Sequence, residues 1–144
     1  MTALTVTPSS VSANDIERGA RVLDYQTGEA ITKGQAVYLD SSNLAWRAKS
    51  DSAAHARAVG IDVGADNFAG ETSVVAGGWI GVAVFGPVNG FSGLSQGQVG
   101  WVGANAGEVV DTAPSGGAWD FQLGHAVDDQ TFFVDPGTSS PVSV

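Results

Sequence analysis

Short apolar runs separated by glycine-rich turns dominate the pattern along this chain. The runs are rich in β-branched or aromatic residues and recur about every ten residues, a spacing typical of antiparallel strands. We interpret the following as strands: Arg21–Tyr25, Ala36–Leu39, Leu44–Ala48, Ala58–Val63, Glu71–Val75, Trp79–Phe85, Glu108–Asp111 and Thr131–Asp135. The pattern predicts a mainly β protein, a compact barrel or sandwich, rather than βαβ units.

Turn residues refine this prediction at three places. Ala36–Leu39 and Leu44–Ala48 should form a hairpin around the polar turn that starts at Asp40. Pro87, Asn89–Gly90 and Gly93 should close the strand that begins at Trp79. One short helix is expected within residues 50–58, where Ser50 can act as the N-cap and four of the next eight residues are alanine. At barely two turns, this helix needs packing to be stable.

Parts of the pattern occur twice. Four pairs of positions lie 63 residues apart, and a pair of glycines in later runs lies 64 apart: Gly34/Gly97, Gln35/Gln98, Val37/Gly100, Tyr38/Trp101 and Gly60/Gly124. The chain therefore resembles two copies of one strand–turn–strand unit, at residues 28–63 and 94–127, which should share one sheet or barrel. No catalytic residue recurs with them, so the repeated feature is scaffold.

The two ends differ from the domain at residues 16–137. Residues 1–15 lack aromatic residues, and Leu4, Val6 and Val11 alternate loosely with hydroxyl residues. We expect an extended arm that does not hold itself on the domain and instead docks on the sheet edge of a neighbour. A frayed terminus is the alternative. The tail at 138–144, rich in Ser and Pro, should be flexible.

Charge is unevenly distributed along the 144 residues. All six basic residues lie within the first 57 positions, whereas residues 58–144 carry nine acids and account for the net charge of −9. A chain this short of Lys and Arg is a poor ligand for nucleic acid, which we exclude as a partner. We interpret the acidic half as solvated surface. The alternative is that the neutral N-terminal half of the protein docks on a partner while the acidic half faces solvent.

Composition also bears on where the protein is made. There is no cysteine, which fits synthesis in a reducing cytoplasm and excludes thiolate metal sites. The first residues show no secretory signal pattern. The longest apolar-rich stretch, Val74–Val88, is broken by glycines and is too short to span a bilayer, so no membrane partner is expected.

Residues that could carry chemistry are few. His55 and His125 have no second histidine at metal-ligand spacing, so structural or solvated roles are favoured. Asp128–Asp129 is interpreted as a turn, and the looser group Asp62, Asp66 and Glu71 lacks the spacing of a calcium loop. We expect neither an enzyme nor a cofactor or metal.

The four tryptophans suggest a sugar-binding surface as one possibility, because flat aromatic faces stack on sugar rings. Trp46 and Trp101 lie in the repeated units, where aromatic residues usually fill the core. Trp119 follows a glycine loop and is the one most expected to be exposed. Core roles are favoured over a ligand platform.

The order of these segments is similar to that of a known family. "GEAITKGQAVYLD", "AWRAKSDSAAHARAVGI", "AGGWIGV", "LSQGQVGWVG", "VVDTAPSGG", "QLGHAV" and "TFFVDPG", over residues 28–137, together resemble the head decoration, or capsid cement, proteins of tailed bacteriophages. The resemblance lies in turn and strand order and is strongest at Gly34–Asp40, Val59–Ile61 and Thr112–Gly117.

This resemblance implies a β-tulip-like fold and a structural virion protein without catalytic residues. Such a protein, made in the bacterial cytoplasm, would bind the outer surface of the phage capsid as a homotrimer and stabilise it by bridging major capsid subunits. We expect the arm residues Leu4, Val6 and Val11, together with Arg18, Arg21 and Leu23, to contact the capsid or a neighbouring subunit. The alternative is a carbohydrate- or receptor-binding module of a phage fibre or tail.

Overall fold

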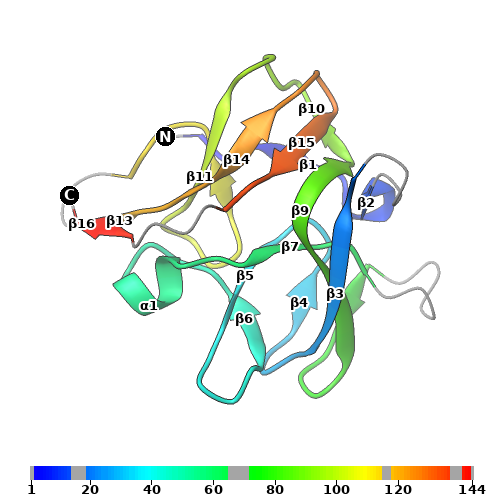
Figure 1. The fold of residues 1–144 in the computed structure, drawn as a ribbon, viewed down its shortest axis with the longest axis vertical. Helices are drawn as coiled ribbons and strands as arrows, with labels where there is room; N and C mark the ends of the chain where they lie inside the picture. Colours follow the sequence, from blue (N-terminus) through cyan, green and yellow to red (C-terminus); the bar gives the residue numbers. More distant parts are fainter. Residues whose placement is uncertain (1, 14–18, 65–71, 115–117, 137–140, 144) are drawn as a thin grey trace.

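In a computed structural model, the chain folds into a mainly β body with one short helix, which confirms the predicted fold class (Figure 1). The structure describes residues 2–13, 19–64, 72–114, 118–136 and 141–143. The first half contains β1 (Thr5–Val6), the 3-10 turn η1 (Pro8–Ser10), β2 (Ser12–Ala13), β3 (Arg21–Gln26), β4 (Ile31–Thr32), β5 (Ala36–Leu39), β6 (Ala45–Arg47), α1 (Ala53–Ala56) and β7 (Gly60–Asp62). The second half contains β8 (Ser73–Val74), β9 (Trp79–Asn89), β10 (Phe91–Ser92), β11 (Val99–Val102), β12 (Val109–Val110), β13 (Trp119–Asp120), β14 (Gln122–Ala126), β15 (Thr131–Val134) and β16 (Val142–Ser143).

The main sheet curls into half a barrel around the long strand β9. Its path runs β12-β11-β14-β15-β9-β7-β5-β6, and β2 and β3 also pair with β9, outside that path. The described residues also form small two-stranded sheets, β1–β10, β4–β8 and β13–β16. All the strand pairs are antiparallel, as expected for neighbours joined by short turns.

The two related segments occupy opposite ends of the main sheet with the same strand order. In the first, β5 pairs with the strand that follows it, β6, and then with β7, which leads to β9. In the second, β11 pairs with β12 and then with β14, which leads to β15. The main path of the sheet therefore consists of two four-stranded halves that meet at the β9–β15 pair.

The turns that open these halves share one hydrogen-bond pattern. Gln35 N–H donates to Thr32 O at 3.1 Å, and Gln35 Oε1 accepts from Thr32 N–H at 2.9 Å. Gln98 makes the same two bonds with Ser95, at 2.9 and 3.1 Å. The residues before the glutamines, Gly34 and Gly97, have φ of 94° and 83°, as the third position of a type II turn requires. A third turn of this shape, Asn105–Glu108, opens β12 and was not predicted.

The curled sheet encloses two apolar clusters. The larger is formed mainly by the second half and includes Phe132, Leu123 and Val88. The smaller lies under the first half and contains Ile31, Val37, Ala45, Ile80 and Val82. Because β9 contributes to both clusters, it joins the two parts of the core.

Three local predictions are wrong. The strand from Trp79 passes through Pro87 and ends at Asn89, so the expected closure at Pro87 is wrong and the one at Asn89–Gly90 is confirmed. Gly86, just before the proline, has a φ of 105° and lies against the backbone of Ala20. The N-cap of α1 is Ser52, whose side chain accepts from His55 N–H. Ser50 is instead buried, and its backbone bonds to Gly103 and Trp119. The tail is not wholly flexible, since β16 pairs with β13.

Candidate functional site

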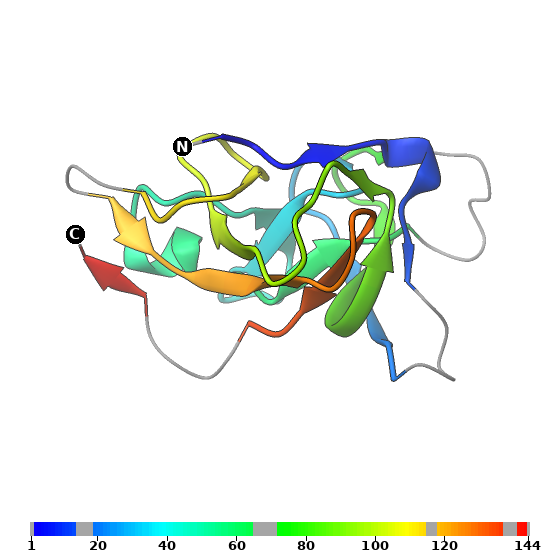
Figure 2. The ribbon, with the colours of Figure 1, turned by 90° about the horizontal axis from the view of Figure 1, so that it is seen from above.

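The N-terminal segment is extended, as predicted, but it lies along its own domain rather than away from it. β1 pairs with β10, and β2 pairs with β9. Leu4 N–H also donates to Val109 O, and Thr7 N–H donates to Gly90 O, both at 2.8 Å. Figure 2 shows the segment as a strap across one side of the molecule. The expectation that it does not hold itself on the domain is therefore wrong.

Val11 is the anchor of this strap. Its side chain is 1% exposed and belongs to the larger core cluster. It lies so close to Gly90 that a Cβ there would come within 2.7 Å of the Val11 Cα atom. Val11 is thus a core residue, and in this conformation it cannot be the surface contact that the sequence suggested.

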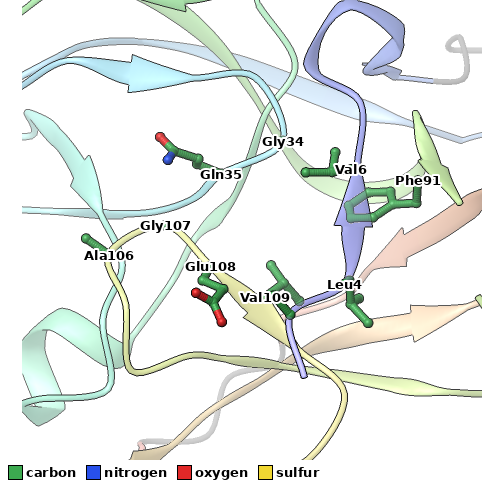
Figure 3. A pocket seen from close by; sticks show the side chains of 10 residues that line it. Leu4, Val6, Gly34, Gln35, Phe91, Ala106, Gly107, Glu108 and Val109 are labelled. Carbon is green, nitrogen blue, oxygen red and sulfur yellow. The ribbon is translucent and has the colours of Figure 1, made fainter. Parts of the chain in front are cut away.

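Leu4 and Val6 cover a small cavity beneath the strap (Figure 3). The cavity measures about 260 Å³, which is just below the usual size of ligand pockets, roughly 300–1,000 Å³. Two polar side chains line it, Gln35 and Glu108, and each already bonds within its own turn.

Arg21 and Leu23, the predicted contact residues after the arm, do lie on the surface. Both belong to β3, whose first four residues are exposed. β3 is at the opposite side of the molecule from β13 and β16 (Figure 1). Arg18, the remaining predicted residue, lies outside the described residues.

The histidines have local partners only. His55 Nδ1 lies 2.8 Å from Asp51 Oδ1, and its ring packs 4.9 Å from that of Tyr38. The His125 ring stacks on Phe133, with ring centroids 5.5 Å apart. Across the described ranges, no three His, Asp or Glu side chains gather as a metal site.

The predicted turn role of Asp128 is confirmed. Its Oδ1 atom accepts from the N–H groups of Gln130 and Thr131, at 2.9 and 2.8 Å, in the loop between β14 and β15. Of the looser acidic group, Asp66 and Glu71 fall outside the described residues.

Asp62 is the one strongly perturbed acid that the structure describes. Its side chain is fully buried at the end of β7; Oδ1 accepts from Gly64 N–H at 2.7 Å, whereas Oδ2 has no hydrogen-bond partner. Desolvation raises the pKa of Asp62 to about 6, against the opposing effects of the Gly64 bond and of Lys33. A sequence signal existed, because Asp62 interrupts a run expected to be a buried strand.

The exposed tryptophan is Trp79, not Trp119. Trp79 is 53% exposed at the start of β9, whereas Trp119 is half-buried and packs against the larger core cluster. Trp46 is half-buried over Gly28, and its Nε1 donates to Asp40 Oδ2 at 2.8 Å. A position next to a glycine loop did not predict the exposure of Trp119, because β16 pairs with the strand that holds this residue.

No family model matches the chain, and no curated protein matches it. Within the described part of the chain, no helix is long and apolar enough to cross a bilayer.

Proposed function

We propose that the protein is a structural virion component, a decoration or cement protein that binds the outside of a phage head. It acts as a homotrimer and stabilises the shell by bridging major capsid subunits. The proposal begins from the resemblance of residues 28–137 to that family. The proposed role of the protein is mechanical, so its function depends on the surface that contacts the shell.

The observation that carries the proposal is the repetition of scaffold. The turns before β5 and β11 have the same glycine conformation and the same pair of glutamine bonds, and the strands after them pair in the same order. These turns also lie in the segments "GEAITKGQAVYLD" and "LSQGQVGWVG", which belong to the resemblance. Two of the segments that resemble the family are therefore ones that shape this β body.

Avidity supports the same role. A shell presents the same subunit many times, so a decoration protein needs only a modest contact with each. The described surface provides exposed apolar side chains for such contacts, at Val22, Leu23, Trp79 and Phe85.

The test uses expanded, DNA-free shells that lack this protein, isolated from the virus that encodes it. We expect the purified protein to co-sediment with these shells, to saturate at a fixed number of copies per shell and to raise the temperature at which the shells disassemble. An unrelated acidic protein of similar mass serves as the control for trapping. Failure to co-sediment at micromolar concentration would exclude the proposed role.

A second candidate function is a glycan- or receptor-binding module of a fibre, and one observation favours it. Trp79 presents an indole that is 53% exposed, with Gln26 directly opposite it on β3. Aromatic faces flanked by amides suit sugar rings. If this function is correct, glycans should quench the fluorescence of the wild type, and Trp79→Ala should lose the quenching while Trp46→Phe retains it.

A further inference from the structure

β3 is paired on one side only. It runs antiparallel to β9 from Arg21 to Gln26, and none of the described residues forms a strand on its outer side. Its first four residues are exposed whichever face they point to. Natural proteins usually protect such an edge, because its unpaired N–H and C=O groups can bind another strand.

The surface around this edge is unusually apolar. Of the six large hydrophobic side chains exposed in the described ranges, four belong to β3 or β9, namely Val22 (40%), Leu23 (44%), Phe85 (42%) and Trp79 (53%). Val22 leans over the bare backbone of Gly81, where an added Cβ would come within 3.0 Å of its Cγ1 atom. Although the β3–β9 register shifts between Arg21 and Val22, an apolar edge of this kind suits an extended segment.

An arginine without a partner among the described residues marks the end of the edge. Arg21 lies opposite Phe85 and makes no hydrogen bond or ion pair with the described residues. By contrast, Arg47 pairs with Glu29 at 2.9 Å and Lys49 with Asp51 at 3.9 Å. In a chain of net charge −9 with no basic residue after position 57, an arginine that no described residue pairs with favours a partner with a carboxylate at this edge.

We propose that an extended segment of the major capsid protein adds to the outer edge of β3 as a further strand. Backbone hydrogen bonds provide the register, apolar side chains of the segment pack on Val22, Leu23 and Phe85, and a carboxylate pairs with Arg21. This inference rests on the proposed function, because it names the surface that meets the shell.

A second copy of this chain fits the edge less well. If two β3 strands paired about a two-fold axis, residues that point to the same face of the sheet would lie opposite each other. Arg21 would then lie opposite Arg21, Leu23 or Tyr25, and never opposite Asp24, whose side chain points to the other face. The edge is also short. Six residues span about 20 Å, and a strip of about 10 Å width gives on the order of 200 Å². A stable dimer in solution needs about 800 Å² of buried surface per partner. On a shell, the binding free energies of many small contacts add together, so each contact can be weaker.

The experiment compares β3 variants with matched surface controls in the shell co-sedimentation assay. Leu23→Lys places a charge on the edge, and Arg21→Glu reverses the cation. Val75→Lys and Val142→Lys change apolar residues that are even more exposed than Leu23, 74% and 62% against 44%, and that belong to neither β3 nor β9. Because all four side chains are exposed, the thermal unfolding temperatures should stay close to that of the wild type.

We expect the control variants to bind shells like the wild type and both β3 variants to bind roughly tenfold or more weakly. If the wild type binds and the β3 variants bind equally well, the edge is not the contact, although the proposed function stands. If the wild type does not bind, the proposed function is wrong and the capsid protein is excluded as the occupant. If light scattering shows an oligomer that Leu23→Lys converts to a monomer, the occupant is a second copy, and the proposal is overturned.

Discussion

At the scale of single residues, the two glutamine turns provide a matched pair. Gly34 and Gly97 have the same left-handed backbone, but their surroundings differ. A Cβ at Gly34 would lie 2.6 Å from the Val6 Cγ2 atom of the strap, whereas a Cβ at Gly97 would meet nothing within 4 Å. The same turn thus closes a loop in one place and packs the N-terminal strap in the other.

Alanine substitutions should separate these two roles. Gly97→Ala should cost about 1 kcal/mol of unfolding free energy, from backbone strain alone. Gly34→Ala should cost clearly more, because the strap must also shift, and Val6→Ala in the same chain should recover part of the difference. Urea unfolding followed by tryptophan fluorescence measures all three. Equal losses at both glycines would mean that the strap does not press on the turn.

Asp62 should make stability depend on pH in the opposite sense to most acids. Folding raises its pKa from 3.8 to about 6, so the folded state holds the proton more tightly. Below about pH 4 the Asp62 carboxyl is protonated in both the folded and the unfolded state, so it costs no stability. Between about pH 4 and 6 the unfolded state ionises first and the stability of the fold falls. Above about pH 6 the full cost of burying the charged carboxylate remains. Two pKa units correspond to about 3 kcal/mol.

Asp62→Asn should therefore stabilise the fold at pH 8 by up to about 3 kcal/mol and have little effect near pH 4. The amide oxygen can still accept from Gly64 N–H. Asp40→Asn is a control of opposite sign, because the bond from Trp46 and the Leu44 and Ser42 N–H groups lower the pKa of Asp40. It should lose stability at neutral pH and approach the wild type in acid. A gain from Asp62→Asn that does not change with pH would show that folding does not shift the pKa of this carboxyl.

At the scale of elements, the strap is part of the fold. Val11→Ala should lower the unfolding free energy by about 2 kcal/mol, because it empties a fully buried site in the larger core cluster. Val75→Ala, at a side chain that is 74% exposed, should change it by less than about 0.5 kcal/mol. Removing residues 1–13 should destabilise the domain further than Val11→Ala does. A truncated chain as stable as the wild type would show that the strap is only laid on the surface.

The sequence predicted elements well where local pattern decides them. The β5–β6 hairpin was found because Asp40 and Asn43 are typical turn residues; in the structure Asp40 Oδ1 accepts from Ser42 N–H, and Asn43 has a φ of 62°. β3 and β15 were found because β-branched and aromatic residues alternate there. In these cases the information lies within a few adjacent residues.

The remaining features depend on distant partners. β9 passes through Pro87 because that residue falls between the stretches of β9 that pair with β3 and β2, an irregular position that tolerates proline. The docking of the strap on its own domain was not predicted because its hydrogen-bond partners, Gly90 and Val109, are distant from it in the sequence. The open edge of β3 could not be found for the same reason, since exposure of Leu23 depends on which strands lie beside it.

At the scale of the whole molecule, β9 holds the two halves together. It pairs with β15 and β7 on the main path and with β2 and β3 outside it, and its side chains enter both core clusters. The small sheets at the ends have few such connections. β13 and β16 pair only with each other, through two residues each. Loss of β9 pairing must separate the halves, whereas loss of β13–β16 need not.

Hydrogen exchange should therefore rank the strands by their distance from β9. We expect amides of β9 and β15 to exchange only through global unfolding, with rates that respond to denaturant as steeply as the whole transition. Amides of β16 should exchange through local opening that denaturant hardly affects, since little surface is exposed when this strand separates from β13. Mass spectrometry of peptides covering residues 79–89 and 141–143, at increasing urea below the transition, measures both. Equal protection of the two peptides would mean that the ends unfold with the centre as one unit. The β13–β16 pair would then be part of the cooperative core that β9 joins.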